Sequence, residues 1–490
     1  MIKVYLNGHK LEYEIKDIIN LFFNDNIVFV NEIPASSRDI FISSSLSEKA
    51  GEIVVSSKVI DSDIYEEEIT KREITEDSSM SRRKIIKRAV KFGLMRVLVK
   101  ATKKEIPWGM LTGIRPTKVV QELFDKGMND DEILNKLQVD FGVFNSKASI
   151  MIQVARNEAK ILNRNNDPNI ISVYVGIPFC PDRCLYCSFT SNPIKKYAKV
   201  VDSFIEAIKK EINAVGKIID AKGWKIESLY MGGGTPTSLN NEQMCMILEE
   251  VDRVFKLSSI EEFTIEAGRP DTLDREKLAT MKKYGVNRIS INPQTMNHET
   301  LRLIGRNHSI EDIETAFNIT RAEGFDNINM DVIVGLPGED ESMMLNTLDR
   351  IKTLGPESLT VHTLAIKRGS KLVQDKKNYV LPDESEVQAM IELCRSKAAE
   401  MGMIPYYLYR QKNMVGHQEN VGYSFSGKEC TYNIKMIEEV QSILALGPGA
   451  VTRYLYRETG AIEKIFNDKS VEGYIARIDE MIERKINACK

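Results

Sequence analysis

The sequence predicts an α/β protein with a central (β/α)6 barrel, or most of one, between an amino-terminal α+β domain and a carboxy-terminal mixed domain. From residue 171 onward, six short apolar segments alternate with amphipathic ones, which is the βαβ pattern of a parallel sheet. The first third of the chain mixes strand-like and helix-like segments without that alternation. We therefore expect domains at 1–165, 166–370 and 371–490.

The amino-terminal region begins with a hairpin signal. Residues 2–15 alternate in polarity around Asn7-Gly8, a dipeptide that favours a primed two-residue turn. The charge run at 66–76 predicts a solvated linker. Further strands are expected at 27–31 and 52–60, and helices at 16–23, 82–102 and, for the most part, 130–163.

The alternating region resolves into strands and the helices between them. Strands are expected at 171–178, 226–231, 262–267, 287–292, 328–334 and 358–366. Helices are expected at about 199–219, 240–256, 273–284, 310–323 and 341–354. In barrels of this kind the chemistry lies at the carboxyl ends of the strands, so that edge is where we expect the functional side chains.

Three cysteines follow the first of these strands in the stretch IPFCPDRCLYCSFTSN. Cys180, Cys184 and Cys187 have the spacing C-x3-C-x2-C, so three thiolates converge from one loop. Three thiolates leave one iron of a cubane cluster open, whereas a structural zinc normally recruits a fourth Cys or His. The four remaining cysteines are isolated in the sequence, which weakens the alternative of a zinc loop.

Polar and glycine residues mark the ends of the other strands. A Gly232-Gly233-Gly234 triplet follows the second strand, where it makes either a tight turn or a close approach to a ligand. Glu266 and Asp331 are carboxylates in apolar strands and need a cation, either a ligand or a structural partner. The lone histidines His362 and His417 are more typical of core or surface positions than of ligands.

Composition excludes several classes of protein. The chain has 490 residues and a net charge of -3, with 67 basic and 70 acidic residues, which argues against a general nucleic-acid binder. It has no run of eighteen apolar residues and no signal-peptide pattern at its start, so a membrane span or secretion is not expected. Seven cysteines, an odd number, favour a reducing compartment. We expect a cytoplasmic enzyme.

Across roughly residues 171–455 the chain resembles the oxygen-independent coproporphyrinogen III oxidase family of radical S-adenosylmethionine (SAM) proteins. The resemblance rests on YVGIPFCPDRCLYCSF, YMGGGTPTSL, TIEAGRP, NPQTMNHETLRLIGRNHS, NMDVIVGLPGE and LALGPGAVTRY. The amino-terminal stretch EIPWGMLTGIRPTKVVQELFDKG is similar to the HemZ branch, which is coproporphyrinogen dehydrogenase-like.

The resemblance implies a cofactor site and its residues. The three cysteines would hold a [4Fe-4S] cluster, and no catalytic side chain beyond the cluster and SAM site is implied. SAM on the open iron would contact Tyr174, Gly233, Glu266 and the backbone near Val451. A second SAM position would use Tyr186, Gly234, Thr235, Gln294, Arg306, Asp331 and Ala365. Substrate propionates would meet basic side chains, for which Arg115 and Lys118 are candidates.

The function implied is that of a radical SAM oxidoreductase of heme biosynthesis. A 5′-deoxyadenosyl radical would start oxidative decarboxylation of coproporphyrinogen propionates to vinyl groups, with an unidentified electron donor. Two other functions stay open, a heme-binding chaperone and a radical SAM enzyme for another tetrapyrrole such as heme. The oxidase branch has a cysteine where this chain has Phe189, and the chaperone branch has a His-Asn pair where this chain has Glu419-Asn420.

Overall fold

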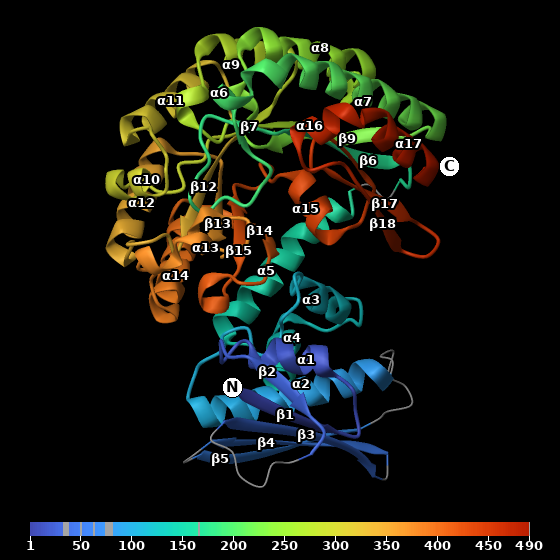
Figure 1. The fold of residues 1–490 in the computed structure, drawn as a ribbon, viewed down its shortest axis with the longest axis vertical. Coiled ribbons are helices and arrows are strands. Elements are labelled where there is room, and N and C mark those ends of the chain that lie inside the picture. The colour runs from blue at the N-terminus through green and yellow to red at the C-terminus, as the bar shows by residue number, and fades with distance from the viewer. Residues whose placement is uncertain (33–38, 50, 62–63, 74–81, 165–166, 490) are drawn as a thin grey trace. The chain divides into compact units, whose positions relative to one another are not determined.

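The computed structural model describes residues 1–490 except 33–38, 50, 62–63, 74–81, 165–166 and 490. The chain divides into two compact units, Met1–Ile152 and Gln153–Lys490 (Figure 1). The predicted domain boundaries at 165 and 370 remain predictions. None of the helices in the described ranges has the length and apolarity needed to cross a membrane.

The first unit is built on a five-stranded sheet in the order β2-β1-β3-β4-β5. Its strands are β1 (Ile2–Asn7), β2 (Ile27–Val30), β3 (Ile40–Lys49), β4 (Glu52–Asp61) and β5 (Ile64–Glu73). Its helices are α1 (Glu12–Ile19), α2 (Arg82–Thr102), α3 (Thr117–Phe124) and α4 (Asp130–Phe141). Helix α2 packs on β4 and β5, so its apolar face covers the antiparallel half of the sheet.

The predicted hairpin around Asn7-Gly8 is wrong. Strand β1 pairs in parallel with β2 and β3, and α1 begins at Glu12. Gly8 has φ 74°, and a Cβ at this position would lie 2.1 Å from the backbone oxygen of Leu46. The glycine therefore lets the chain pass close to β3. From the sequence alone, the Asn7-Gly8 pair fits such a close approach as well as it fits a turn.

The predicted linker at 66–76 is also wrong for the part that the structure describes. Residues 66–73 belong to β5, and the remaining three lie outside the described residues. The charges of the strand are paired: Glu67 with Lys58 at 3.2 Å, and Glu68 with Lys100 of α2 at 2.6 Å. The side chains of an edge strand reach solvent and the charged groups of adjacent elements. Such a strand can therefore have the charged composition that is expected of a linker.

The second unit contains six parallel strands in consecutive positions of one sheet, as the sequence predicts. They are β6 (Ile170–Ile177), β9 (Lys225–Gly233), β10 (Glu262–Glu266), β11 (Arg288–Ser290), β12 (Ile328–Val334) and β13 (Ser358–Thr363). Their residues are almost all buried, as expected for strands covered on both faces. This is the (β/α)6 architecture of a partial barrel.

Helices form an outer arc around these strands in Figure 1, running from α7 in green to α14 in orange. The main ones are α7 (Val201–Lys222), α8 (Asn241–Phe255), α9 (Arg275–Lys283), α11 (Ile310–Ala322), α12 (Glu341–Leu354) and α14 (Glu384–Glu400). Helix α5 (Asn145–Leu162) begins in the first unit and ends in the second. Asn240, Ser309 and Asp383 start three of them with complete capping boxes. The first two of these starts agree with the predicted helices at 240–256 and 310–323, whereas α14 was not predicted. Shorter elements are β7 (Phe179–Cys180), β8 (Asn192–Pro193), α6 (Ile194–Tyr197), α10 (His298–Leu303) and α13 (Lys371–Gln374).

Strands from the carboxy-terminal third extend the same sheet at both ends. Antiparallel β15 (Asn420–Ser424) and β14 (Ile404–Tyr409) follow β13. On the other side, β16 (Ile443–Leu446) pairs in parallel with β6, followed by β17 (Val451–Tyr456) and β18 (Ala461–Phe466). The remaining helices are α15 (Thr431–Glu438), α16 (Val471–Ala476) and α17 (Ile478–Ala488).

A buried polar network holds the turn between β16 and β17. Glu211 of α7 is fully buried and accepts hydrogen bonds from the Gly447 amide at 2.9 Å, the Tyr474 hydroxyl at 2.6 Å and Lys485 Nζ at 2.7 Å. These hydrogen bonds satisfy both oxygens of the buried carboxylate. The turn that leads to Val451 is thereby fixed at the carboxyl edge of the parallel strands.

Candidate functional site

The cysteine loop and the glycine loop lie against each other at the carboxyl edge of β6 and β9. Cys180 follows β6 directly, and the Thr235 hydroxyl donates to its sulfur at 3.5 Å. The amide of Gly234 donates to the Ile177 oxygen at 2.7 Å. A Cβ on Gly234 would lie 2.4 Å from the Phe179 oxygen and 3.0 Å from the Cys180 sulfur. The glycine is thus required beside the first cysteine.

The three cysteines are free thiols, and the surroundings of Cys180 and Cys187 resist ionisation. Cys180 and Cys184 are buried, and Cys187 is partly exposed. Burial raises the pKa of Cys180 to about 11, and burial also raises the pKa of Cys187. In each case the other thiols of the loop add to the rise, which places the three sulfurs within electrostatic reach of one another. A bound metal would be needed to hold them as thiolates.

Within the residues that the structure describes, no three His, Cys, Asp or Glu side chains gather closely enough to hold one ion. In a cubane each cysteine binds a different iron, so three thiolates from one loop would leave the fourth iron open.

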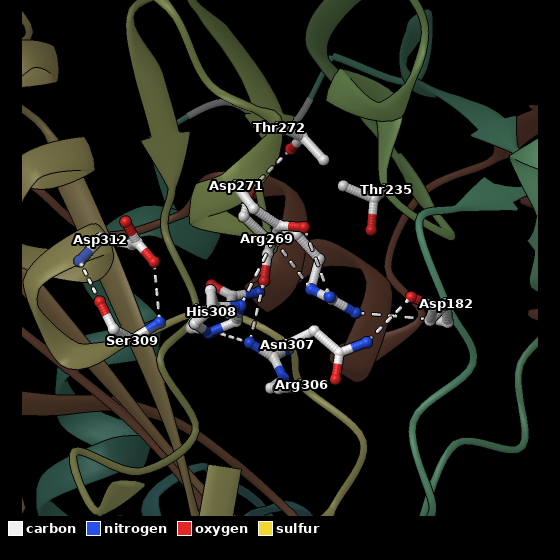
Figure 2. Close-up of polar contacts among 12 residues, drawn as sticks. Asp182, Thr235, Arg269, Asp271, Thr272, Arg306, Asn307, His308, Ser309 and Asp312 are labelled. Atoms are coloured by element: carbon white, nitrogen blue, oxygen red, sulfur yellow. Dashed lines mark hydrogen bonds and ion pairs between the residues drawn. The ribbon is translucent and has the colours of Figure 1, made fainter. Parts of the chain in front are cut away.

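Side chains from neighbouring strands anchor the cysteine loop (Figure 2). Arg269, which follows β10, donates to the Asp182 backbone oxygen at 3.4 Å, and Asn307 donates to the Asp182 carboxylate at 3.3 Å. Arg269 also pairs with Asp271 at 3.2 Å, and Asp271 lies 3.3 Å from His308. Burial opposes ionisation of Asp271, but His308 and Arg269 lower its pKa to about 2. Asp271 therefore favours its ionised form, in which it pairs with Arg269, and Arg269 in turn holds the cysteine loop at Asp182.

Arg306 lies beside the same loop. Its side chain is almost completely buried and donates to the backbone oxygens of Gly268 at 3.2 Å and Asn292 at 2.5 Å. Burial lowers the pKa of the guanidinium, but interactions with Tyr186 and Cys184 outweigh this and raise it. Burial likewise raises the pKa of the Tyr186 hydroxyl, despite Arg306. Arg306 thus brings a permanent positive charge next to the second cysteine.

Glu266 ends β10 in a pocket of tyrosines and glycine. The Tyr230 hydroxyl donates to Glu266 Oε1 at 2.6 Å, and a Cβ on Gly232 would lie 3.0 Å from Oε2. Burial raises the pKa of Glu266 to about 7, with the nearby charge of Asp331 contributing. The Tyr230 ring stacks on Tyr432 at 4.7 Å and on Tyr174 at 6.2 Å. Such a carboxylate gains strongly from a cationic ligand.

Asp331 and Gln294 form the next part of the edge. Asp331 accepts from Asn329 at 2.6 Å and lies 3.6 Å from His362 of β13. Burial opposes ionisation of Asp331, but the contact with His362 outweighs it, so the pKa is lowered. Gln294 has φ 67°, donates its amide to the Asp331 backbone oxygen at 2.9 Å, and leaves its buried side-chain oxygen without a partner. Strain and an orphaned acceptor together mark a binding position.

The remaining candidate residues fall into two groups. Ala365 follows β13 and forms an isolated antiparallel β-bridge with Met414. Val451 begins β17, after the turn that the Glu211 network holds. Both residues lie in the second unit. Arg115 and Lys118 lie in the first unit, at the start of α3. Their assignment to substrate propionates remains a prediction.

Several site residues were missed by the sequence analysis. Tyr230 lies in a predicted strand and Tyr432 in a mixed polar and apolar segment, and nothing in either pattern separates a tyrosine that lines a site from one in the core. His362 was interpreted as a core or surface residue but pairs with Asp331. A signal was available only for Arg269, since a basic residue directly after a strand of the barrel lies at the functional edge.

The residues present fit a cluster and SAM. Three free thiols, glycines that permit close approach, a carboxylate whose pKa is raised by burial and two orphaned polar atoms, Gln294 Oε1 and Arg306 Nε, converge on one edge. The roles of single residues toward SAM are proposals.

Comparison with known proteins agrees with this geometry. The radical SAM superfamily matches residues 174–351. The chain is 37% identical over 486 residues to the oxygen-independent coproporphyrinogen-III oxidase-like protein HemZ of Bacillus subtilis, covering 98% of this chain and 96% of the relative. It is 35% identical over 240 residues to the heme chaperone HemW of the same organism, covering 48% of this chain and 62% of the relative.

The fold has a solved counterpart. The coproporphyrinogen III oxidase HemN of Escherichia coli, described as a radical SAM enzyme, superposes with a TM-score of 0.51 at 23% identity. The match covers 66% of this chain and 72% of that one. The likeness supports the partial-barrel architecture. The full-length similarity to HemZ shows that the chain belongs to the HemZ-like oxygen-independent coproporphyrinogen-III oxidase family of radical SAM proteins, whose cofactors are a [4Fe-4S] cluster and SAM.

Proposed function

We propose that the protein is a radical SAM oxidoreductase that decarboxylates propionate side chains of coproporphyrinogen III to vinyl groups. The observation that carries this proposal is the 37% identity, along nearly the whole chain, to a relative named as coproporphyrinogen-III oxidase-like. The cluster and SAM candidates that gather at one edge of the barrel support a radical SAM reaction.

In this proposal the cysteine loop binds the cluster, and Glu266 positions SAM. When bound, the cluster and SAM supply a 5′-deoxyadenosyl radical, which removes a hydrogen atom from a propionate. Glu266 accepts hydrogen bonds from the SAM ammonium, held in place by the Tyr230 hydroxyl at 2.6 Å. The Gln294 side-chain oxygen, buried and without a partner, accepts from a ligand hydroxyl.

The stacked tyrosines restrict the pocket around Glu266. Tyr174, Tyr230 and Tyr432 lie nearly parallel, with interplanar angles of 16° to 24°. Their rings limit access of water to the carboxylate, which strengthens its interaction with a cationic ligand. SAM is thereby oriented before the substrate reacts.

A second function, heme transfer, is favoured by one observation. The heme chaperone HemW of Bacillus subtilis is 35% identical over about half of this chain. Such a protein would take up heme stoichiometrically and would not couple SAM cleavage to a change in the tetrapyrrole. Turnover of another tetrapyrrole, such as heme, is the third case.

One anaerobic assay separates the three functions. Reconstituted protein is incubated with SAM, a reductant and an electron acceptor, with either coproporphyrinogen III or hemin, and 5′-deoxyadenosine and porphyrin mass are measured. The proposal predicts 5′-deoxyadenosine that depends on coproporphyrinogen and rises with vinyl-bearing products. Cys184→Ala protein is the control for background cleavage.

Two results of this assay contradict the proposal. Stoichiometric hemin binding, with 5′-deoxyadenosine no higher than in the substrate-free control for either tetrapyrrole, indicates a chaperone. Formation of 5′-deoxyadenosine with hemin alone indicates a different substrate.

A further inference from the structure

Two loops that follow the first and the last of the six parallel strands meet at the carboxyl edge of the second unit. The cysteine loop follows β6, and residues 364–374 follow β13. The Arg183 guanidinium donates to the Gly369 backbone oxygen at 2.7 Å, and the Leu372 amide donates to the Leu185 oxygen at 3.0 Å. Leu185 and Leu372 also belong to one buried apolar cluster. The surface that the two loops form is therefore held in place by contacts between them.

This surface carries positive charge that lacks carboxylate partners. Residues 364–374 contain Lys367, Arg368 and Lys371 and no Asp or Glu. Arg368 and Lys371 are exposed, and none of the three has a carboxylate within ion-pair distance among the residues that the structure describes. Arg183 adds a further cation from the cysteine loop. In a chain with a net charge of -3, such a concentration of unpaired cations favours an anionic partner.

An exposed aromatic ring lies within the same surface. Phe189 is 67% exposed and comes two residues after Cys187. The Lys367 ammonium lies 5.7 Å from the centre of its ring. An exposed aromatic side chain beside arginines is typical of a protein–protein contact. Cys187 alone among the three cysteines is partly exposed, so the surface adjoins the point at which the cysteine loop reaches solvent.

We propose that the Phe189 surface, formed by Arg183, Phe189, Lys367, Arg368 and Lys371, docks an acidic redox protein that supplies the electron for SAM cleavage. The inference rests on the proposed attachment of the cluster to the three cysteines and holds whichever tetrapyrrole reacts. One electron leaves the reduced cofactor of the partner and is taken up by the oxidised cluster, and no bond forms or breaks in this transfer. The cations attract the acidic partner, and the Phe189 ring packs against it.

Exposure favours a protein on this surface over the tetrapyrrole. Gln294 and Arg306, candidates for the SAM site, are 7% and 5% exposed, whereas Phe189, Arg368 and Lys371 are exposed. A substrate has to reach the radical that forms in the water-excluded part of the site. A protein that only delivers an electron stays outside that part and needs an accessible face beside the cysteine loop.

The experiment measures docking to a flavodoxin, an acidic flavin protein that carries single electrons. Full-length, anaerobically reconstituted protein is titrated calorimetrically with oxidised flavodoxin at low and high salt. Reduction of the cluster by reduced flavodoxin is followed by absorbance after rapid mixing. Arg368→Glu/Lys371→Glu should weaken binding and slow the second-order reduction by at least about tenfold at low salt, because like charges then face each other. The difference from the wild type should shrink at high salt.

Lys217→Glu/Lys464→Glu is the matched control. It makes the same change in net charge at two exposed lysines of α7 and β18, so it should alter both measurements far less. Phe189→Ala should weaken binding about tenfold at low and high salt alike, because it removes an aromatic contact and no charge. Iron content and reduction by dithionite, which needs no docking, show whether each variant holds a reducible cluster.

The proposal is overturned if Arg368→Glu/Lys371→Glu has the wild-type values, if the control loses as much, or if flavodoxin neither binds nor reduces the wild type. Should Phe189→Ala lose its iron, the charge-reversed variant decides. A raised KM for coproporphyrinogen in that variant, with flavodoxin binding unchanged, would assign the cations to the substrate. Absence of coproporphyrinogen turnover with dithionite as reductant contradicts the proposed function alone and leaves the docking result in force.

Discussion

Glu266 combines a raised pKa with a short hydrogen bond from Tyr230, because the end of β10 withdraws its carboxylate from water. The same withdrawal raises the pKa of Cys180 to about 11. Burial thus disfavours the ionised forms of both groups, and a bound cation or metal would stabilise those forms. Their side chains are preorganised for ligands.

Replacing Cys184 tests the cluster assignment. Anaerobically reconstituted wild-type protein should bind about four irons and absorb broadly in the visible, whereas Cys184→Ala should lose this cluster. The chain should remain folded, since the change removes one small side chain. Iron analysis, absorbance and circular dichroism check the prediction. Tight stoichiometric zinc in the wild type would contradict it.

Replacing Glu266 tests the SAM assignment. Glu266→Gln should weaken SAM binding by about 1.5–3 kcal/mol, because a charge-assisted hydrogen bond is lost while cluster content is kept. The pKa of about 7 adds a pH dependence: wild-type affinity should rise as pH increases through 7, since only the carboxylate binds the ammonium. Glu266→Gln should lack this rise. Calorimetric titration with SAM at several pH values measures both effects, and identical affinities would make Glu266 a structural residue.

The cysteines and glycines of the site could be predicted from sequence, because their spacing is local and their chemistry is specific. Tyr230, Tyr432 and His362 could not. Their roles depend on which strands become neighbours, and the stacking of Tyr432 on Tyr230 joins residues about two hundred positions apart. The field that Arg306 exerts on Cys184 is equally invisible in the pattern of either segment.

At the scale of elements, α15 is held over the barrel by one buried carboxylate. Glu262, at the start of β10, accepts hydrogen bonds from the backbone amides of Thr431 at 2.6 Å and Tyr432 at 3.1 Å, the first residues of α15. These amides have no partner within the helix, so the carboxylate caps it. The cap positions Tyr432 against Tyr230 and so connects the start of β10 with the pocket at its end.

Removing this cap should weaken the helix and the pocket together. We expect Glu262→Ala to lower the free energy of unfolding by about 1–2 kcal/mol, the usual effect of losing a capping side chain. Affinity for SAM should also fall, since Tyr432 loses its anchor. Urea unfolding and SAM titration measure the two effects. Glu276→Ala, at an exposed position of α9, is the control. A loss of stability without any change in SAM affinity would mean that Tyr432 does not shape the pocket.

Elements with strong local signals were predicted most accurately. The six parallel strands and helix 82–102 lie close to their predicted ranges, because continuous apolar runs and helical spacing persist over many residues. The strands β3 and β5 were missed, since polar residues such as Ser43–Ser45 and Glu66–Glu68 occupy an otherwise strand-like stretch. Their pairing in the sheet is a tertiary effect that overrides local preference.

At the scale of the whole molecule, every cluster and SAM candidate lies in Gln153–Lys490, while Arg115 and Lys118 lie in Met1–Ile152. The second unit also retains the end of α5, where Asn157 donates to the Pro405 oxygen at 2.8 Å. We therefore expect SAM cleavage to need only the second of the two units. The other is available for a different task, such as binding propionates.

A chain that starts at residue 153 should bind the cluster and cleave SAM slowly without substrate. In the full-length protein, replacing Arg115 and Lys118 together by Ala should raise the KM for coproporphyrinogen and leave substrate-free SAM cleavage unchanged, because carboxylate partners are lost. Steady-state kinetics and product analysis test both statements. An unchanged KM would place the propionate contacts in the second unit, and failure of the shortened chain to bind iron would show that the units depend on each other.

The central claim is that the three cysteines and the Glu266 pocket form one radical SAM site. Electron paramagnetic resonance of reduced, reconstituted protein, recorded with and without SAM, tests it most directly. The account predicts the signal of a single reduced [4Fe-4S] cluster, and the shape of this signal should change when SAM binds the open iron. Glu266→Gln protein should need a higher SAM concentration for the same change. A cluster signal that is the same with and without saturating SAM would contradict it.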